Sequence, residues 1–236
     1  MTIITYRIED SSQTWWIKLE TTAKLACNFW NRFVQPASSI IVRLGTFNSS
    51  GNTIARAYKP YRSPDGNIYG VVQFNVRFLQ QFSDYEIAGT IIHEIGHLLG
   101  IGYDQWYTLF DFRSGRFTNQ SIRQLSDLQY MSVETDYGPG TQYSHWDEES
   151  RFKQELMTGF KDKYEYVLPA TIRVMRLLGH FIKEDLLYKT PLTELIQEVD
   201  GITFSMMESV EKIDLDYFEE TELNEEIYFK NKIKKQ

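Results

Sequence analysis

The chain has 236 residues, of which 42% are hydrophobic and 24% are charged, and its formal net charge is −7. This length predicts one domain with a full hydrophobic core, and the acidic balance excludes a general nucleic-acid binder, which needs a basic surface to neutralise phosphates. The single cysteine, Cys27, excludes an internal disulfide framework and is expected to be a small buried residue.

Residues 1–20 lack the basic segment and apolar core of a signal peptide. No apolar run in the chain approaches the ~20 residues that a membrane span needs. We therefore expect a protein without a membrane span that is cytoplasmic or exported by a leaderless route. Its oligomeric state is not indicated by any pattern in the sequence.

The first part of the chain, residues 1–104, reads as an N-terminal subdomain of strands and helices. Apolar residues recur at helical spacing from Leu19 to Val34, which predicts a helix. β-branched and aromatic runs, separated by breaks that contain Asn, Gly and Pro, predict neighbouring strands. These strands are expected at residues 5–9, 38–47, 52–58 and 68–76.

A second helix is predicted at the end of this subdomain. Ser83 and Glu86 form an S-x-x-E capping box just before a periodic apolar run that starts at Ile87. The helix is expected to stop at Gly100, because glycine readily adopts the left-handed conformation that ends helices.

The next part, residues 105–189, is expected to be a smaller C-terminal subdomain that follows the helix-ending glycine. It opens with a long stretch rich in Gly, Ser, Asp, Tyr and Trp, and such a long loop is more often functional than structural. A helix with Pro169 in its first turn is predicted at residues 168–181. The remaining residues, 190–236, are predicted to be an acidic accessory tail that is partly helical at 191–213.

The helix before Gly100 contains the pattern H-E-x-x-H at residues 93–97. Residues four apart lie on one helix face, so His93 and His97 can reach a single ion. Zinc binds imidazole nitrogen, and a catalytic zinc site keeps one position for water, from which Glu94 can take a proton. The alternative is a helix whose two histidines are ordinary core or surface residues, with Glu94 as a solvated charge.

The chain has four histidines, so His145 and His180 remain as sources of a third nitrogen ligand. In the compact form of the motif a third histidine follows three residues after the glycine, and Tyr103 occupies that position here. Asp104, the next residue, is an alternative ligand because carboxylates also bind zinc. His180 lies at a predicted helix end, where it is expected to interact with the helix dipole.

Three segments occur in a fixed order along the chain: HEIGHLLG at 93–100, SHW at 144–146 and ELMTG at 155–159. With them the sequence resembles the leishmanolysin family of metzincin zinc peptidases. In that family a long insertion separates the glycine from the third histidine, which sits in an S-H-W context and precedes a methionine turn. The resemblance covers roughly residues 20–182.

The resemblance implies an α+β, metzincin-like fold with a twisted mixed sheet over two long helices and a cleft between the two subdomains. It implies one catalytic Zn²⁺ ion bound by His93, His97 and His145. Glu94 would be the general base and then the acid, and Gly100 would turn the chain out of the helix.

By the same resemblance, Met157 would form the hydrophobic floor beneath the metal. Residues 68–76 would be the sheet edge along which an extended protein or peptide substrate pairs its backbone. The implied function is a zinc-dependent endopeptidase that uses a Glu-activated water. The alternative is a catalytically silent metzincin-fold binding or scaffold protein with a structural zinc, a type of site that is usually closed by four protein ligands.

Two features depart from the family pattern. The chain has one cysteine where familiar members have cysteine-rich C-terminal parts, and Gly159 stands where some other metzincins carry a tyrosine after the methionine. No tyrosine is therefore assigned a role in the transition state. Trp106 and Trp146, in the long loop, either line a substrate pocket or anchor the loop.

Overall fold

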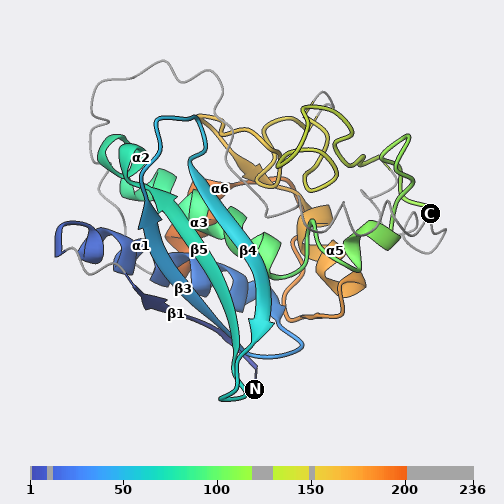
Figure 1. Ribbon diagram of the computed structural model, residues 1–236. Coiled ribbons are helices and arrows are strands. Elements are labelled where there is room, and N and C mark those ends of the chain that lie inside the picture. The colour runs from blue at the N-terminus through green and yellow to red at the C-terminus, as the bar shows by residue number, and fades with distance from the viewer. Residues whose placement is uncertain (1, 10–12, 119–129, 149–151, 201–236) are drawn as a thin grey trace.

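The chain has an α+β fold in the computed structural model, which describes residues 2–9, 13–118, 130–148 and 152–200. A twisted four-stranded mixed sheet lies in front of two long helices, α1 (Gln13–Phe33) and α3 (Asp84–Leu98), in Figure 1. The helices cover one face of the sheet, and no described helix lies over the other face.

The strands follow the order β1-β3-β5-β4 across the sheet. They comprise Ile4–Ile8 (β1), Ile40–Phe47 (β3), Ala55–Arg62 (β4) and Ile68–Asn75 (β5). β1, β3 and β5 run parallel, whereas β4 pairs antiparallel with β5. Alternate residues of β3, namely Ile40, Val42 and Leu44, are buried, which is the period-two pattern of a sheet with one covered face.

β5 lies between β3 and β4, so the prediction that residues 68–76 form the sheet edge is wrong. The edge strands are β1 and β4, and of these β4, which precedes β5 in the sequence, contacts α3. A Cβ atom on Gly70 of β5 would lie 2.5 Å from Leu98 Cδ1 of α3, which shows how closely the interior strand packs on this helix. Strand order depends on the connections between strands, and the local pattern of one strand does not reveal it.

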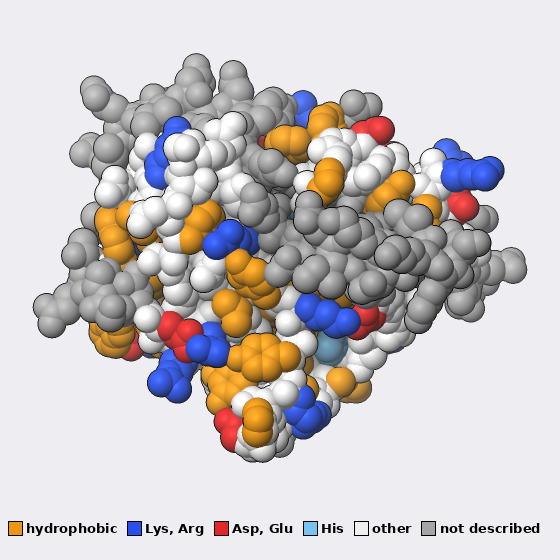
Figure 2. Space-filling view, viewed as in Figure 1, with side chains coloured by type: hydrophobic (Ala, Val, Ile, Leu, Met, Phe, Trp, Pro, Cys, Tyr) orange, Lys and Arg blue, Asp and Glu red, His pale blue; other side chains and the backbone are white. Residues whose placement is uncertain are grey.

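Arginine and tyrosine side chains interact on the sheet face over which no described helix lies. Tyr61 of β4 stacks on Tyr69 of β5 with ring centroids 5.9 Å apart, and Arg43 of β3 donates a hydrogen bond of 2.6 Å to the Tyr61 hydroxyl. Figure 2 shows this side of the molecule, over which basic and apolar side chains are intermixed. The opposite face of the sheet is the one that α1 and α3 bury.

α1 supports α3 directly behind the H-E-x-x-H segment. Phe29, Trp30 and Phe33 are fully buried, and Trp30 Nε1 donates a hydrogen bond of 2.8 Å to the Ile92 carbonyl, one residue before His93. α1 begins earlier than the residue Leu19 at which the apolar periodicity starts.

A short helix, α2 (Val76–Gln81), follows β5 without a loop and was not predicted, because the strand pattern continued through residue 76. The Asn75 side chain begins it by accepting a hydrogen bond of 3.2 Å from Arg77 N.

The capping box predicted for α3 is confirmed. Ser83 Oγ accepts a hydrogen bond of 3.3 Å from Glu86 N, and Glu86 Oε2 accepts one of 2.8 Å from Ser83 N. Residues 87–98 are all buried, so this helix runs through the interior. Gly100 has a φ of +113°, in the left-handed region that favours glycine, and turns the chain away from the helix end.

The part of the chain after α3 contains little regular structure. Its described elements are η1 (Trp106–Thr108), β6 (Tyr166–Val167), α5 (Pro169–Leu177), β7 (Phe181–Ile182), β8 (Thr190–Pro191) and α6 (Leu192–Asp200). β7 pairs with β2 (Val34–Gln35), and β8 pairs with β6. The helix predicted at 168–181 is thus shorter, because Leu178 and Gly179 end it.

α6 packs on α1 and α3 through the buried side chains of Leu192, Leu195 and Ile196. The first residues of the predicted accessory tail therefore belong to the described core. The remainder of that tail, and of the helix predicted at 191–213, lies outside the described residues. Within the described ranges, each helix is too short or too polar to cross a bilayer.

Candidate metal centre

Three buried histidines lie close together at the C-terminal half of α3. His93 and His97 lie one helical turn apart on α3, and His145 reaches them from the irregular segment before α5. His93 Nε2 lies 2.9 Å from His97 Nε2 and 3.3 Å from His145 Nε2. All three side chains are fully buried, and their ligating atoms lie within 4.8 Å of one another. These residues can therefore hold one metal ion.

The second nitrogen of each ring faces a backbone carbonyl. The contacts are His93 Nδ1 to Leu156 O at 2.7 Å, His97 Nδ1 to Ile101 O at 3.1 Å and His145 Nδ1 to Thr141 O at 3.0 Å. A carbonyl only accepts hydrogen bonds, so each Nδ1 carries the proton and each Nε2 presents a lone pair. The Nε2 lone pairs of His97 and His145 repel that of His93, since the nitrogen atoms are only 2.9 and 3.3 Å apart, and a shared cation removes that repulsion. The donor set therefore fits a metal ion.

The protonation state of His97 also suits metal binding. Burial lowers the pKa of His97 well below its usual value, and the neighbouring His93 and His145 lower it further. The neutral imidazole is the form that ligates metals. Carbonyl partners of this kind fix both the tautomer and the orientation of a ligating ring.

Glu94 is fully buried and directly follows His93 on α3. Asp104 lies apart from the three histidines. The Asp104 carboxylate is exposed and forms an ion pair with Lys59, with an Nζ–Oδ2 distance of 2.7 Å. The structure therefore brings His145 to the helix histidines and leaves Asp104 at the surface.

His180 has a different role from that of the three clustered histidines. Its Nε2 donates a hydrogen bond of 2.7 Å to Leu99 O at the end of α3, and its Nδ1 accepts one of 3.1 Å from Ala37 N. Burial lowers the pKa of His180, which keeps the ring in the neutral form that can both donate and accept. The ring thus joins the end of α3 to the segment after β2.

Met157 packs against the turn of α3 that contains Gly96 and His97. It is fully buried, and a Cβ atom on Gly96 would lie 2.7 Å from Met157 Sδ and 2.9 Å from Met157 Cε. Gly96 is one residue before His97, so its missing side chain is what lets the methionine approach the helix beside the ligands. Sequence reasoning had assigned no role to this glycine.

Replacing Gly96 with alanine is expected to destabilise the fold by about 1–3 kcal/mol through overpacking, even though alanine favours a helix by about 1 kcal/mol. Gly89→Ala is the matched control on the same helix, since its new Cβ would meet no atom closer than Leu192 Cδ2 at 3.1 Å. Urea unfolding of both variants measures the difference. Equal stability of the two variants would contradict tight packing of Met157 on Gly96.

The carboxylate of Glu155 organises the turn that contains Met157. Its oxygens accept hydrogen bonds from Met157 N at 2.7 Å, Leu168 N at 3.1 Å and Thr171 Oγ1 at 2.6 Å. Burial raises the pKa of Glu155 to about 7, while these hydrogen bonds oppose the rise. The sequence placed Glu155 in the ELMTG segment without a function, and an acidic residue two positions before the methionine was the only signal it offered.

The two tryptophans of the long segment anchor it. Trp106 and Trp146 are fully buried, and their ring centroids lie 5.2 Å apart. Trp106 Nε1 donates a hydrogen bond of 2.7 Å to Tyr143 O, and Trp146 Nε1 donates one of 2.9 Å to Thr171 Oγ1. Tyr143 has a φ of +66°, an uncommon conformation for a bulky residue, two positions before His145. Of the two readings from the sequence, anchoring is the one that the burial of both rings supports.

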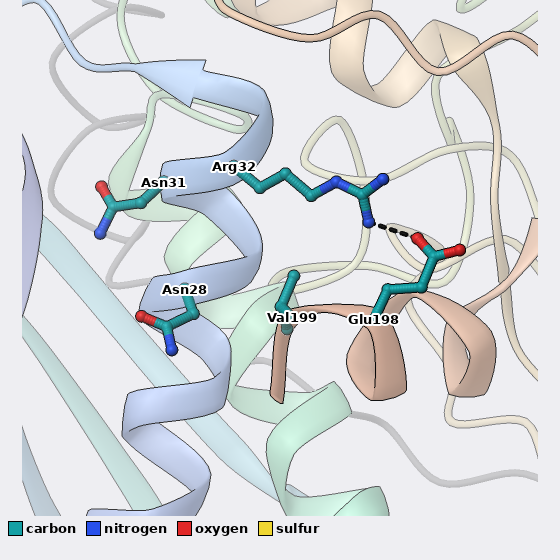
Figure 3. A pocket seen from close by; sticks show the side chains of 5 residues that line it. All are labelled: Asn28, Asn31, Arg32, Glu198 and Val199. Atoms are coloured by element: carbon teal, nitrogen blue, oxygen red, sulfur yellow. Dashed lines mark hydrogen bonds and ion pairs between the residues drawn. The ribbon is translucent and has the colours of Figure 1, made fainter. Parts of the chain in front are cut away.

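A shallow pocket of about 470 Å³ lies between α1 and α6, away from the three histidines (Figure 3). It is lined by Asn28, Asn31, Arg32, Glu198 and Val199. Arg32 forms ion pairs with Glu198 and with Glu184, and the figure shows the first of these spanning the pocket. The pocket contains none of the residues that the sequence motif singled out.

Comparison of the sequence with protein-family models and with curated proteins finds no match. The geometry of the histidine cluster and the surrounding contacts therefore carry the functional argument.

Proposed function

We propose that the chain is a metzincin-like, zinc-dependent endopeptidase in which His93, His97 and His145 hold the zinc. The observation that carries this proposal is the convergence of three buried imidazoles, whose possible ligand atoms all lie within 4.8 Å of one another. Zinc binds nitrogen at about 2.0–2.1 Å, which places tetrahedral ligands roughly 3.3 Å apart. The Nε2 separations of 2.9 and 3.3 Å are close to that spacing.

The number of ligands favours a catalytic site over a structural one. Structural zinc is usually enclosed by four protein ligands, often cysteines, whereas catalytic zinc has three and an open position. The cluster found among the described residues supplies three histidines, and the one cysteine of the chain, Cys27, is buried in α1.

Bound zinc supplies a Lewis acid that polarises a carbonyl oxygen and lowers the pKa of water. Glu94 then acts as the general base that takes a proton from the attacking water, and it returns that proton to the leaving amine. Its full burial, at the position after His93, shields the carboxyl group from bulk solvent. The carbonyls of Leu156, Ile101 and Thr141 keep the three rings oriented through both steps.

β4 is the strand that we propose pairs with an extended substrate. It is the sheet edge next to α3, and edge strands offer donors and acceptors to an added strand. The Ala57 carbonyl of β4 accepts a hydrogen bond of 3.3 Å from the Tyr103 hydroxyl, just after the end of α3. This contact connects β4 to the residues after α3 and occupies the Ala57 carbonyl, so an added strand would pair with other groups of this edge.

The test is cleavage of casein and of quenched fluorescent peptides by the zinc-loaded protein. We expect hydrolysis of internal peptide bonds, loss of that activity with a chelator, and recovery on addition of zinc. A folded, zinc-loaded protein that cleaves none of a broad peptide library would instead support the silent binding or scaffold alternative. Circular dichroism of the chelated protein completes the test, because loss of the fold on chelation is typical of a structural zinc.

A further inference from the structure

Glu155 connects the methionine turn to the first turn of α5. Through Met157 N it holds the turn that packs on α3, and through Leu168 N and Thr171 Oγ1 it holds the first turn of α5. Leu168 precedes α5 and its own side chain makes no capping hydrogen bond, so the carboxylate of a distant residue caps this helix.

These contacts lead directly to the supports of the metal ligands. Leu156, the residue after Glu155, provides the carbonyl that orients His93. Met157 O accepts a hydrogen bond of 2.9 Å from Trp146 N, the residue after His145. Trp146 also donates from its indole nitrogen to Thr171 Oγ1, and that hydroxyl donates in turn to Glu155. The supports of His93 and of His145 therefore meet at one carboxylate.

We propose that Glu155 is a positioning residue of the metal centre, which sets the geometry of His93 and His145 through the methionine turn and the Trp146–Thr171 link. This inference deepens the proposed function and rests on it for the identity of the metal. Glu155 itself acts only through other residues, because its carboxylate oxygens are occupied by Met157, Leu168 and Thr171.

The test is Glu155→Gln, studied in the full chain by titration with Co²⁺ and by competition with a zinc chelator. The amide places an N–H donor where the carboxylate accepts from another donor, so at least one of the three hydrogen bonds is lost. We expect zinc to bind about 10–100-fold more weakly, the range for partners that orient a metal ligand, and the Co²⁺ absorption bands to shift.

Glu148→Gln is the matched control. Glu148 is also buried in this half of the chain, and burial raises its pKa to about 8, while a hydrogen bond with Thr158 opposes the rise. Its carboxylate does not bind the three groups that Glu155 holds, which are Met157 N, Leu168 N and Thr171 Oγ1. Zinc affinity and the Co²⁺ spectrum should be unchanged in this variant. Glu155→Gln that matches the parent in both readouts, or equal weakening in both variants, would overturn the inference.

Thr171→Val provides a second variant if Glu155→Gln does not fold. It removes the hydroxyl between Trp146 and Glu155 and leaves the other two bonds of the carboxylate in place. We expect a shifted Co²⁺ spectrum and weaker zinc binding, and a spectrum identical to that of the parent would overturn the inference. Because these readouts are metal binding and not cleavage, a protein without peptidase activity would refute the proposed function and leave this inference standing.

Discussion

Replacing Glu94 with glutamine is expected to lower kcat/KM for peptide cleavage by about 10²–10⁴-fold, the contribution that a general acid–base residue makes. Glutamine keeps the size of the side chain but cannot take up a proton. The three histidines and their carbonyl partners are unchanged, so the zinc content should equal that of the parent protein. Cleavage of a quenched fluorescent peptide and elemental analysis of the same sample measure both quantities.

Glu86→Gln is the control for this experiment, because Glu86 lies on the same helix but at its first turn. Glutamine also serves in a capping box, so the hydrogen bond to Ser83 N is kept and cleavage should continue at the parental rate. A Glu94→Gln protein that holds zinc and still cleaves like the parent would remove Glu94 from the role of general base.

The parts of the molecule that could be predicted from the sequence are those set by neighbouring residues. α3 follows from the capping box at Ser83, the apolar run from Ile87 and the glycine that ends it, all of which act within a few turns. The same helical spacing brings His93 and His97 together without reference to any other part of the chain.

The parts that could not be predicted depend on contacts between distant segments. The position of β5 inside the sheet is set by its pairing with both β3 and β4, which its own alternation does not encode. The role of Glu155 depends on Leu168 and Thr171, residues 13 and 16 positions further on. The requirement for Gly96 depends on Met157, which approaches α3 only in the folded chain.

The third histidine could be predicted only in part from the residues. The residues alone left His145, Asp104 and His180 as candidates, and the resemblance to the leishmanolysin family selected His145. In the structure the choice follows from the folding of the segment around it, in which Thr141 O holds the His145 ring and Trp146 is anchored on Thr171. His180 and Asp104 are engaged elsewhere, with Leu99 O and Lys59 respectively.

Replacing His145 with alanine is expected to weaken zinc binding by more than ~100-fold, because loss of a ligand costs more than the 10–100-fold that loss of an orienting partner costs. The two remaining ligands, His93 and His97, both lie on α3, so the variant should still fold around the same helix. Chelator competition gives the affinity, and elemental analysis after dialysis gives the stoichiometry.

Two further variants make this result specific to His145. Asp104→Ala removes an exposed ion pair with Lys59 and should leave zinc affinity unchanged. His180→Ala removes a half-buried imidazole that donates a hydrogen bond to Leu99 O, so it should lower the free energy of unfolding while one zinc per chain is retained. If instead Asp104→Ala lost the metal and His145→Ala kept it, the third ligand would be Asp104. The position of His145 beside His93 and His97 would then not be explained by metal binding.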